Sequence, residues 1–214
     1  MKPLSGEKLE KELARLEAMR EYEDTYDACA YICGIDEAGR GPLAGPVVAA
    51  AAVLPKDCQI FYLNDSKKLS EKKRDLLFAE IKEKAVAYGI GIVSPQVIDE
   101  INILQATYEA MRQAISQLNV IPEILLNDAV TIPGVDIMQV PIVKGDAKSV
   151  SIAAASILAK VTRDRMMMEY DQIYPEYGFA KHKGYGTAAH IAALKEYGPC
   201  PIHRRTFIKK FVTV

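Results

Sequence analysis

Residues 34–46 read GIDEAGRGPLAGP, and the expected fold can be built outward from this stretch. An apolar run over residues 31–36 leads into it, and a second run, residues 46–54, follows it and is rich in valine and alanine. Both runs have the composition of β-strands. Three glycines and two prolines stand within ten residues between them, which is typical of a turn. The pattern therefore predicts a β-hairpin.

Two adjacent carboxylates, Asp36 and Glu37, stand where the first predicted strand ends. Neighbouring buried carboxylates repel each other and are costly to desolvate, so a fold keeps them together when a cation lies between them. The turn that follows, Gly39-Arg40-Gly41, offers unobstructed backbone N–H groups and one guanidinium. The segment therefore predicts metal-dependent chemistry on a phosphodiester. The alternative is a solvated acidic pair on the surface.

The composition favours one globular domain. The chain has 214 residues, of which 50% are hydrophobic and 26% are charged, enough for a sizeable core. No apolar run approaches the ~20 residues that span a bilayer, and the charged segment 8–20 does not resemble a signal peptide. We therefore expect a cytoplasmic protein with no membrane contact. The four cysteines lack zinc-site spacing and are expected to be free thiols.

The net charge of −1 conceals an uneven distribution. Residues 1–28 carry a net charge of −3 and residues 29–143 a net charge of −4. Residues 144–214 carry twelve basic and six acidic residues, a net charge of +6. A basic C-terminal third is consistent with a patch that binds a polyanion, and equally with a solvated helix surface.

Helices and strands alternate along the rest of the chain. Helices are predicted over residues 7–22, 71–87, 95–118, 150–170 and 188–197, and further strands over 88–93, 124–127 and 138–143. This order predicts an α/β fold with a mixed sheet. Residues 1–28 are expected to form an N-terminal helical arm, and residues 29–214 the main domain.

Further carboxylates follow later predicted strands. Asp128 ends one strand and Asp146 lies just past another. Acids at the strand ends of one sheet can converge at one edge, and with Asp36 and Glu37 they would supply only oxygen ligands. Such ligands suit Mg²⁺ or Mn²⁺ rather than zinc. The alternative for Asp128 and Asp146 is a turn or cap residue. Asp164 is a competing ligand that we interpret as an ion-pair partner on a helix face.

Six blocks of the sequence, in order, resemble the motifs of bacterial ribonuclease HII. They are GIDEAGRGP at 34–42, DSKKL at 65–69, KGD at 144–146, AASILAKVTRD at 154–164, HKGYGT at 182–187 and PIHRR at 201–205. One departure is Asp128-Ala129, where that family more often shows Asp-Gly.

The resemblance implies a ribonuclease H-like fold, with a mixed central β-sheet flanked by helices and a helical C-terminal part. Residues 29–214 become the catalytic domain. The implied activity is endonucleolytic cleavage of the RNA strand of RNA–DNA hybrids, and cleavage on the 5′ side of single ribonucleotides embedded in duplex DNA. The products carry 5′-phosphate and 3′-hydroxyl ends. The implied metal ligands and catalytic residues are Asp36, Glu37, Asp128 and Asp146, with two Mn²⁺ or Mg²⁺ ions in the active complex.

The resemblance also suggests how the substrate is recognised. The backbone of Gly39, Arg40 and Gly41 is implied to reach the 2′-hydroxyl, and Tyr185 to stack on the sugar of the adjoining deoxynucleotide. We expect phosphate contacts, or alternatively solvated charges, at Ser66, Lys67, Lys183 and Arg204. His182 and His203 are expected to be structural rather than proton shuttles.

Other functions fit the sequence less well. The sister family, ribonuclease HIII, carries a large N-terminal domain for which the 28 residues before the core are too few. A non-catalytic binder of hybrids would be expected to lack one of the four acids. A phosphatase would want an enclosed phosphate pocket such as a P-loop, and the chain has no such motif. A sliding-clamp partner is left as an open alternative without support, because residues 207–214 show no clear clamp-binding motif. A monomer is expected.

Overall fold

The computed structural model describes residues 5–212, so residues 1–4 of the expected arm and residues 213–214 of the C-terminal part lie outside the described residues. A five-stranded sheet in the order β3-β2-β1-β4-β5 forms the centre. Its strands are β1 (Ile32–Ala38), β2 (Val47–Val53), β3 (Ala87–Val93), β4 (Ile124–Asp128) and β5 (Met138–Ile142). The first three strands are antiparallel neighbours, whereas β4 lies parallel to β1 and to β5. The predicted hairpin and mixed sheet are confirmed.

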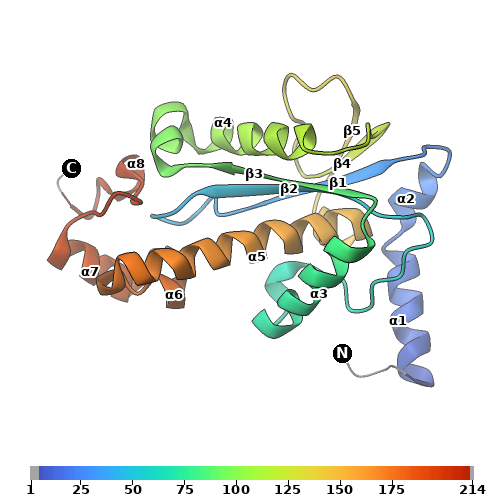
Figure 1. Cartoon of the computed structure of the whole chain (residues 1–214), viewed down its shortest axis with the longest axis horizontal. Coiled ribbons are helices and arrows are strands. Elements are labelled where there is room, and N and C mark those ends of the chain that lie inside the picture. Colours follow the sequence, from blue (N-terminus) through green and yellow to red (C-terminus); the bar gives the residue numbers. More distant parts are fainter. Residues whose placement is uncertain (1–4, 213–214) are drawn as a thin grey trace.

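Helices cover both faces of this sheet (Figure 1). The helix α4 (Pro95–Ser116) lies on one face, and α5 (Val150–Ile173) with α3 (Glu71–Lys84) lies on the other. The alternation of β2 divides the core accordingly: Val48, Ala50 and Ala52 pack with α3 and α5, while the odd-numbered residues pack with α4. All seven residues of β2 are buried, which explains its unbroken apolar sequence.

Glycines allow both helices to approach the sheet closely. A Cβ atom on Gly34 of β1 would lie 2.0 Å from the backbone carbon of Ser151 in α5. One on Gly91 of β3 would lie 1.9 Å from the carbonyl oxygen of Ala110 in α4. Because backbone atoms cannot move aside, only glycine fits at these two positions. The small residues of α5, Ala153–Ala155, meet the sheet in the same tight layer.

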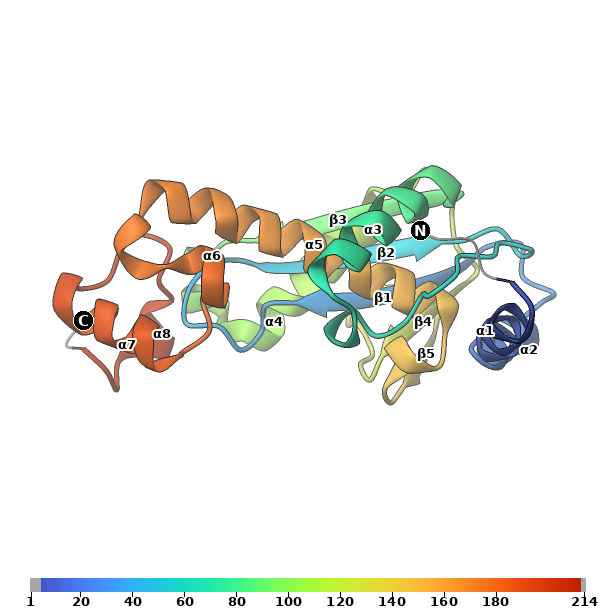
Figure 2. The ribbon, with the colours of Figure 1, turned by 90° about the horizontal axis from the view of Figure 1, so that it is seen from below.

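Short helices lie at the two ends of the molecule (Figures 1 and 2). At one end are α1 (Glu7–Ala18) and α2 (Glu21–Thr25). At the other are α6 (Phe179–His182), α7 (Ala188–Tyr197) and α8 (Arg205–Ile208). In the part of the chain that the structure describes, the remaining elements are 3₁₀ turns: η1 (Ser66–Lys68), η2 (Gly145–Ala147) and η3 (Pro175–Tyr177). Within the described range, no helix is long and apolar enough to cross a membrane.

Two predicted helices differ from their expected form. The helix expected over residues 7–22 is divided into α1 and α2. Between them, the Met19 carbonyl accepts the N–H of Val150, the first residue of α5, at 3.1 Å instead of a hydrogen bond within the helix. The helix expected over 95–118 is interrupted at Asn102, whose φ of 66° is left-handed. The Asn102 side chain accepts the N–H groups of Leu104 at 3.0 Å and Gln105 at 3.1 Å, so it caps the second part.

Candidate active site

Four carboxylates predicted from the sequence meet at one edge of the sheet. The strands β1 and β4 are parallel neighbours with Ile35 opposite Asn127, so Asp36 and Asp128 follow side by side. The Gly145 N–H donates to Asp128 Oδ1 at 2.8 Å, which brings η2 and its residue Asp146 to the same place. The Asp36 carboxylate accepts the N–H of Glu37 at 2.7 Å.

The carboxylates oppose one another electrostatically. Burial raises the pKa of Asp36 well above its usual range, and the charges of Glu37 and Asp128 raise it further. Burial also raises the pKa of Glu37, with Asp128 adding to the shift, although Arg40 opposes it with a guanidinium 3.3 Å away. Burial and the charges of Asp65 and Asp128 raise the pKa of Asp146 to about 6. Asp128 is thus the common neighbour of the other three.

These residues fit a divalent cation. The donor set is made of carboxylate oxygens alone, and Glu37 Oε2 is buried without a hydrogen-bond partner among the described residues. A cation would satisfy that oxygen and relieve the mutual repulsion. Between residues 5 and 212, no three Asp, Glu, His or Cys side chains already stand in an ion-binding arrangement.

Two residues that sequence reasoning did not assign to the site lie beside it. Asp65 lies near enough to Asp146 to raise the pKa of that carboxyl, and Ser156 of α5 lies beside Asp36, where its hydroxyl lowers the pKa of Asp36. Ser156 Oγ also lies 3.0 Å from Ser66 Oγ, which ties η1 to α5. The signals were present, because Asp65 begins the DSKKL block and Ser156 stands within the 154–164 block.

The predicted contact residue Lys67 faces the acids. Burial lowers the pKa of Lys67, but the charges of Asp36, Asp65, Asp146 and Asp128 outweigh it, and the net shift is upward. Ser66, predicted with it, is buried, with its hydroxyl directed to Ser156. The site thus contains a cation opposite its carboxylates before any ligand binds.

Two buried arginines support the turn between β1 and β2. The Arg163 guanidinium donates to the carbonyls of Pro46 at 3.0 Å, Ala44 at 3.0 Å and Lys183 at 2.9 Å. Arg204 donates to Gly39 at 2.5 Å, to Arg40 at 2.9 Å and to Gly45 at 3.0 Å. Burial lowers the pKa of Arg163 to about 10 and, with the charge of Arg163, that of Arg204 to about 9. Both arginines remain charged at neutral pH.

This position corrects the expectation for Arg204. A phosphate contact requires an accessible guanidinium, but the Arg204 side chain is 0% exposed and its donors are occupied by backbone carbonyls. Arg204 therefore holds the turn in place rather than meeting the solvent. Gly39, with φ of 96°, makes room for this packing, since a Cβ there would lie 2.1 Å from Arg163 Nε.

A chain of neutral histidines supports Tyr185. The Cys200 N–H donates to His203 Nδ1 at 3.0 Å, so the His203 proton is on Nε2. That group donates to His190 Nε2 at 3.0 Å, and His190 Nδ1–H donates to the Tyr185 carbonyl at 2.9 Å. Burial lowers the pKa of His190 and lowers that of His203 to about 4. His182 likewise accepts the Gly184 N–H and faces the Tyr177 carbonyl. These contacts agree with the predicted structural role.

A cavity of about 450 Å³ opens beside the acids. Its walls include the Gly39-Arg40-Gly41 turn, whose three N–H groups have no acceptor among the described residues, and the exposed ring of Tyr185. A Cβ on Gly41 would lie 3.8 Å from Tyr185 Cε1, so turn and ring form one narrow slot. The predicted contact Lys183 is nearby, but its ammonium is directed to the Ala180 carbonyl.

The sheet order, the flanking helices and the acidic edge define a nuclease with a ribonuclease H-like fold. Two solved structures share this arrangement. Ribonuclease H2 from Pyrococcus horikoshii is 31% identical, with a TM-score of 0.69 over 85% of this chain and 96% of that one. Ribonuclease HII from Archaeoglobus fulgidus, solved in a complex with PCNA, is 28% identical, with a TM-score of 0.67 over 85% of this chain and 95% of that one.

The chain belongs to the ribonuclease HII family. The family described as Ribonuclease HII matches residues 33–210. The ribonuclease HII of Lachnoclostridium phytofermentans is 67% identical over 97% of this chain and 82% of its own length. The chain is therefore an endonuclease of the ribonuclease H type that acts on RNA–DNA hybrids.

Proposed function

We propose that the enzyme cuts the RNA strand of long RNA–DNA hybrids and also cuts on the 5′ side of single ribonucleotides embedded in duplex DNA. Both reactions would leave 5′-phosphate and 3′-hydroxyl ends. The supporting observation is the convergence of Asp36, Glu37 and Asp146 on Asp128, with a buried Glu37 oxygen that lacks a partner. These four residues are the proposed metal ligands. Two divalent cations, Mn²⁺ or Mg²⁺, would supply activation of a water and stabilisation of the leaving oxygen.

The chain itself would supply orientation. The Asp128 side chain is held by the Gly145 N–H and the Asp36 side chain by the Glu37 N–H, so these carboxylates are directed before substrate arrives. Lys67 faces the same acids and is placed to contact a phosphate of the cleaved strand. These contacts position the reacting linkage without reading its sequence.

The slot between the turn and Tyr185 is the proposed reader of the sugar. The free N–H groups of residues 39–41 suit the oxygen of a 2′-hydroxyl, and glycine lets that sugar come close. The Tyr185 ring, 45% exposed, offers a face for the next sugar, where an additional hydroxyl would clash. The pair would therefore recognise a junction from ribonucleotide to deoxyribonucleotide.

This recognition implies a role in removing misincorporated ribonucleotides from DNA. We propose that the enzyme performs it in the cytoplasm, as a monomer whose residues 29–214 form the catalytic domain and whose residues 1–28 form an arm. The arm is anchored, since Leu16 and Met19 pack in the core beside α5.

The test is cleavage of a labelled DNA duplex containing one ribonucleotide, with Mn²⁺, with Mg²⁺ and with EDTA. A cut on the 5′ side of the ribonucleotide with either metal is expected, with none in EDTA and none in an all-DNA duplex. Binding without any cut, by a folded protein, would instead indicate a non-catalytic hybrid-binding protein and would contradict the assignment of the four acids.

A further inference from the structure

We propose that Lys160 and Arg74 form a second phosphate subsite, which holds a backbone phosphodiester of the bound strand next to the linkage that is cut. Both residues line the 450 Å³ cavity between the Gly39-Arg40-Gly41 turn and η1. The inference rests on the proposed function, because the ligand is the backbone of the same duplex. It adds Arg74, which lies outside the six sequence blocks, and Lys160, which lies within the 154–164 block and has no role in the carboxylate site.

The polar lining of the cavity consists almost entirely of hydrogen-bond donors. Ammonium and guanidinium groups come from Arg40, Lys67, Arg74 and Lys160, whereas the donors of Arg163 are already occupied by backbone carbonyls. Hydroxyls come from Ser66 and Ser156, and free backbone N–H groups from the turn. Glu37 is the one carboxylate among the described residues of this lining, so cationic side chains outnumber carboxylates in it. Such a set of donors suits a tetrahedral oxyanion, which accepts several hydrogen bonds at once.

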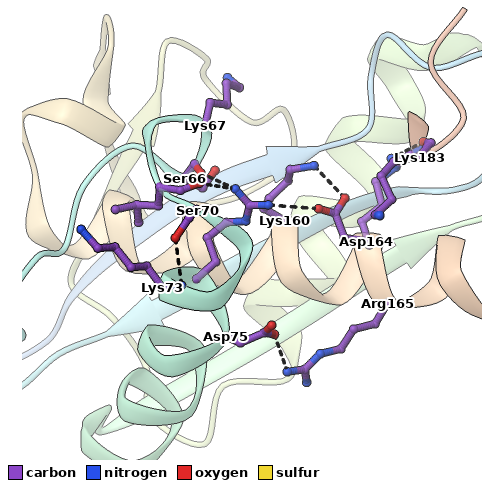
Figure 3. A network of polar contacts seen from close by, with 12 residues as sticks. Ser66, Lys67, Ser70, Lys73, Asp75, Lys160, Asp164, Arg165 and Lys183 are labelled. Atoms are coloured by element: carbon purple, nitrogen blue, oxygen red, sulfur yellow. Dashed lines mark hydrogen bonds and ion pairs between the residues drawn. The ribbon is translucent and has the colours of Figure 1, made fainter. Parts of the chain in front are cut away.

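Lys160 and Arg74 share one buried carboxylate, that of Asp164, and Figure 3 shows Lys160 directed toward it. Lys160 Nζ lies 2.7 Å from Asp164 Oδ1, and Arg74 Nη2 lies 3.7 Å from Asp164 Oδ2. Two cations therefore face one anion, and one positive charge is left over. The predicted ion-pair role of Asp164 is confirmed, but Asp164 does not line the cavity. Because Lys160 and Arg74 both line the cavity, the excess positive charge borders it.

The surroundings of the pair also limit its freedom. Arg74 donates to the carbonyls of Ser66 at 3.1 Å and Leu69 at 2.6 Å, which fixes it to η1. The Lys160 side chain is 19% exposed, and burial lowers its pKa despite the nearby Asp164. A phosphate in the cavity would stabilise the charged ammonium that burial disfavours. Preorganised cations of this kind lose little side-chain entropy when an anion binds.

The experiment measures binding of a duplex with one ribonucleotide in EDTA, where a metal-dependent cut cannot occur. The duplex is prepared as a set in which one phosphate at a time is replaced by a neutral methylphosphonate. Lys160→Met is compared with the wild type and with Lys11→Met, a control at an exposed lysine of α1. For Lys160→Met we expect about tenfold weaker binding at low salt. The slope of log affinity against log salt should fall by about 0.9, the value for one phosphate contact.

The decisive readout is the position of the sensitive phosphate. In the wild type, one methylphosphonate near the ribonucleotide should weaken binding, and Lys160→Met should be insensitive at that position alone. Lys160→Arg should restore both the sensitivity and the salt slope. A purely structural lysine would change the melting temperature and leave the phosphate profile and the slope unaltered. That result would overturn the proposal.

The outcome is separable from that of the proposed function. If the wild type cuts the duplex 5′ of the ribonucleotide but Lys160→Met keeps the full phosphate profile, the subsite is wrong and the activity stands. If the wild type cuts nothing with either metal, the proposed activity fails whatever the binding profile shows.

Discussion

Two charged regions flank the same turn, residues 39–46, and they differ in how their charges are satisfied. On one side, Asp36, Glu37, Asp128 and Asp146 repel one another, and a buried oxygen of Glu37 has no partner. On the other side, the buried cations Arg163 and Arg204 donate to backbone carbonyls. The histidines there form a continuous series of hydrogen bonds in which each ring nitrogen has a partner. The first region is incomplete without a ligand, and the second is complete.

This difference separates the parts of the molecule that bind from those that support. An unsatisfied buried group raises the free energy of the folded protein and is relieved when a ligand supplies the missing partner. A satisfied buried cation stabilises one backbone conformation, here that of the turn facing the substrate. Substitutions should therefore have opposite effects on stability in the two regions, although both reduce activity.

The largest effect is expected for Asp36→Asn. The change removes a proposed metal ligand but keeps the shape, so cleavage should fall about a thousandfold or more, ~4 kcal/mol of transition-state stabilisation. Stability should move the other way, because repulsion among the buried acids decreases; the melting temperature in EDTA should rise. Cleavage rates and calorimetry test both. Near-full activity would refute the ligand assignment, and a lower melting temperature would refute the electrostatic account.

Arg204→Met should destabilise the protein instead. It leaves the carbonyls of Gly39, Arg40 and Gly45 without their donor, at a cost of about 3 kcal/mol. Cleavage should fall as the turn loosens. The neighbouring Arg205→Met is the control, since Arg205 is exposed and the change should cost under ~0.5 kcal/mol. Urea unfolding distinguishes the two; equal stability of both variants would mean that Arg204 does not hold the turn.

The two regions should also respond oppositely to acid. A neutral buried His203 with a pKa of about 4 resists protonation, so its contribution to stability is complete above pH 6.5 and declines as the pH falls toward 4. Asp146, with a pKa of about 6, favours the folded state as the pH falls through the same range. The destabilisation caused by His203→Gln should thus shrink by about 1–2 kcal/mol between pH 7 and pH 5 in EDTA.

Urea unfolding of both proteins at several pH values measures this change. Asp146→Asn is a control of opposite sign. In this variant, the increase in the free energy of unfolding that Asp146 contributes as the pH falls should be absent. A destabilisation by His203→Gln that does not vary with pH would show that His203 is not held neutral.

How far the sequence predicts these regions depends on the range of the contacts involved. The acids could be located because each lies at or just beyond the end of an apolar strand, and parallel strands end at one edge of a sheet. The supporting role of Arg204 could not be predicted, because the carbonyls that it contacts lie as many as 165 residues away in the sequence. An arginine is also as typical of an exposed phosphate contact as of a buried support. The break at Asn102 was hidden for a related reason, because apolar spacing continues through it.

Gly41→Ala acts between the two regions and should affect selectivity rather than stability. A Cβ at this position has room, with its nearest neighbour Tyr185 Cε1 at 3.8 Å, but it would occupy the slot proposed for the ribose. We expect about a tenfold loss of the binding preference for the ribonucleotide-containing duplex over an all-DNA duplex, ~1.4 kcal/mol, at an unchanged melting temperature. Affinities for both duplexes in EDTA provide the test; an unchanged ratio would count against the turn as the reader of the sugar.

The smallest effect concerns Ala129, directly after Asp128, where the family more often has glycine. Its φ of 57° is left-handed, which costs an alanine about 1 kcal/mol, while glycine adopts it freely. Ala129→Gly should therefore stabilise the protein by about 0.5 kcal/mol after the greater entropy of the unfolded chain is subtracted. Ala192→Gly, on the exposed side of α7, should instead destabilise by about 1 kcal/mol. Urea unfolding resolves this difference in sign, and equal losses at both positions would mean that the strand end at Asp128 is not strained.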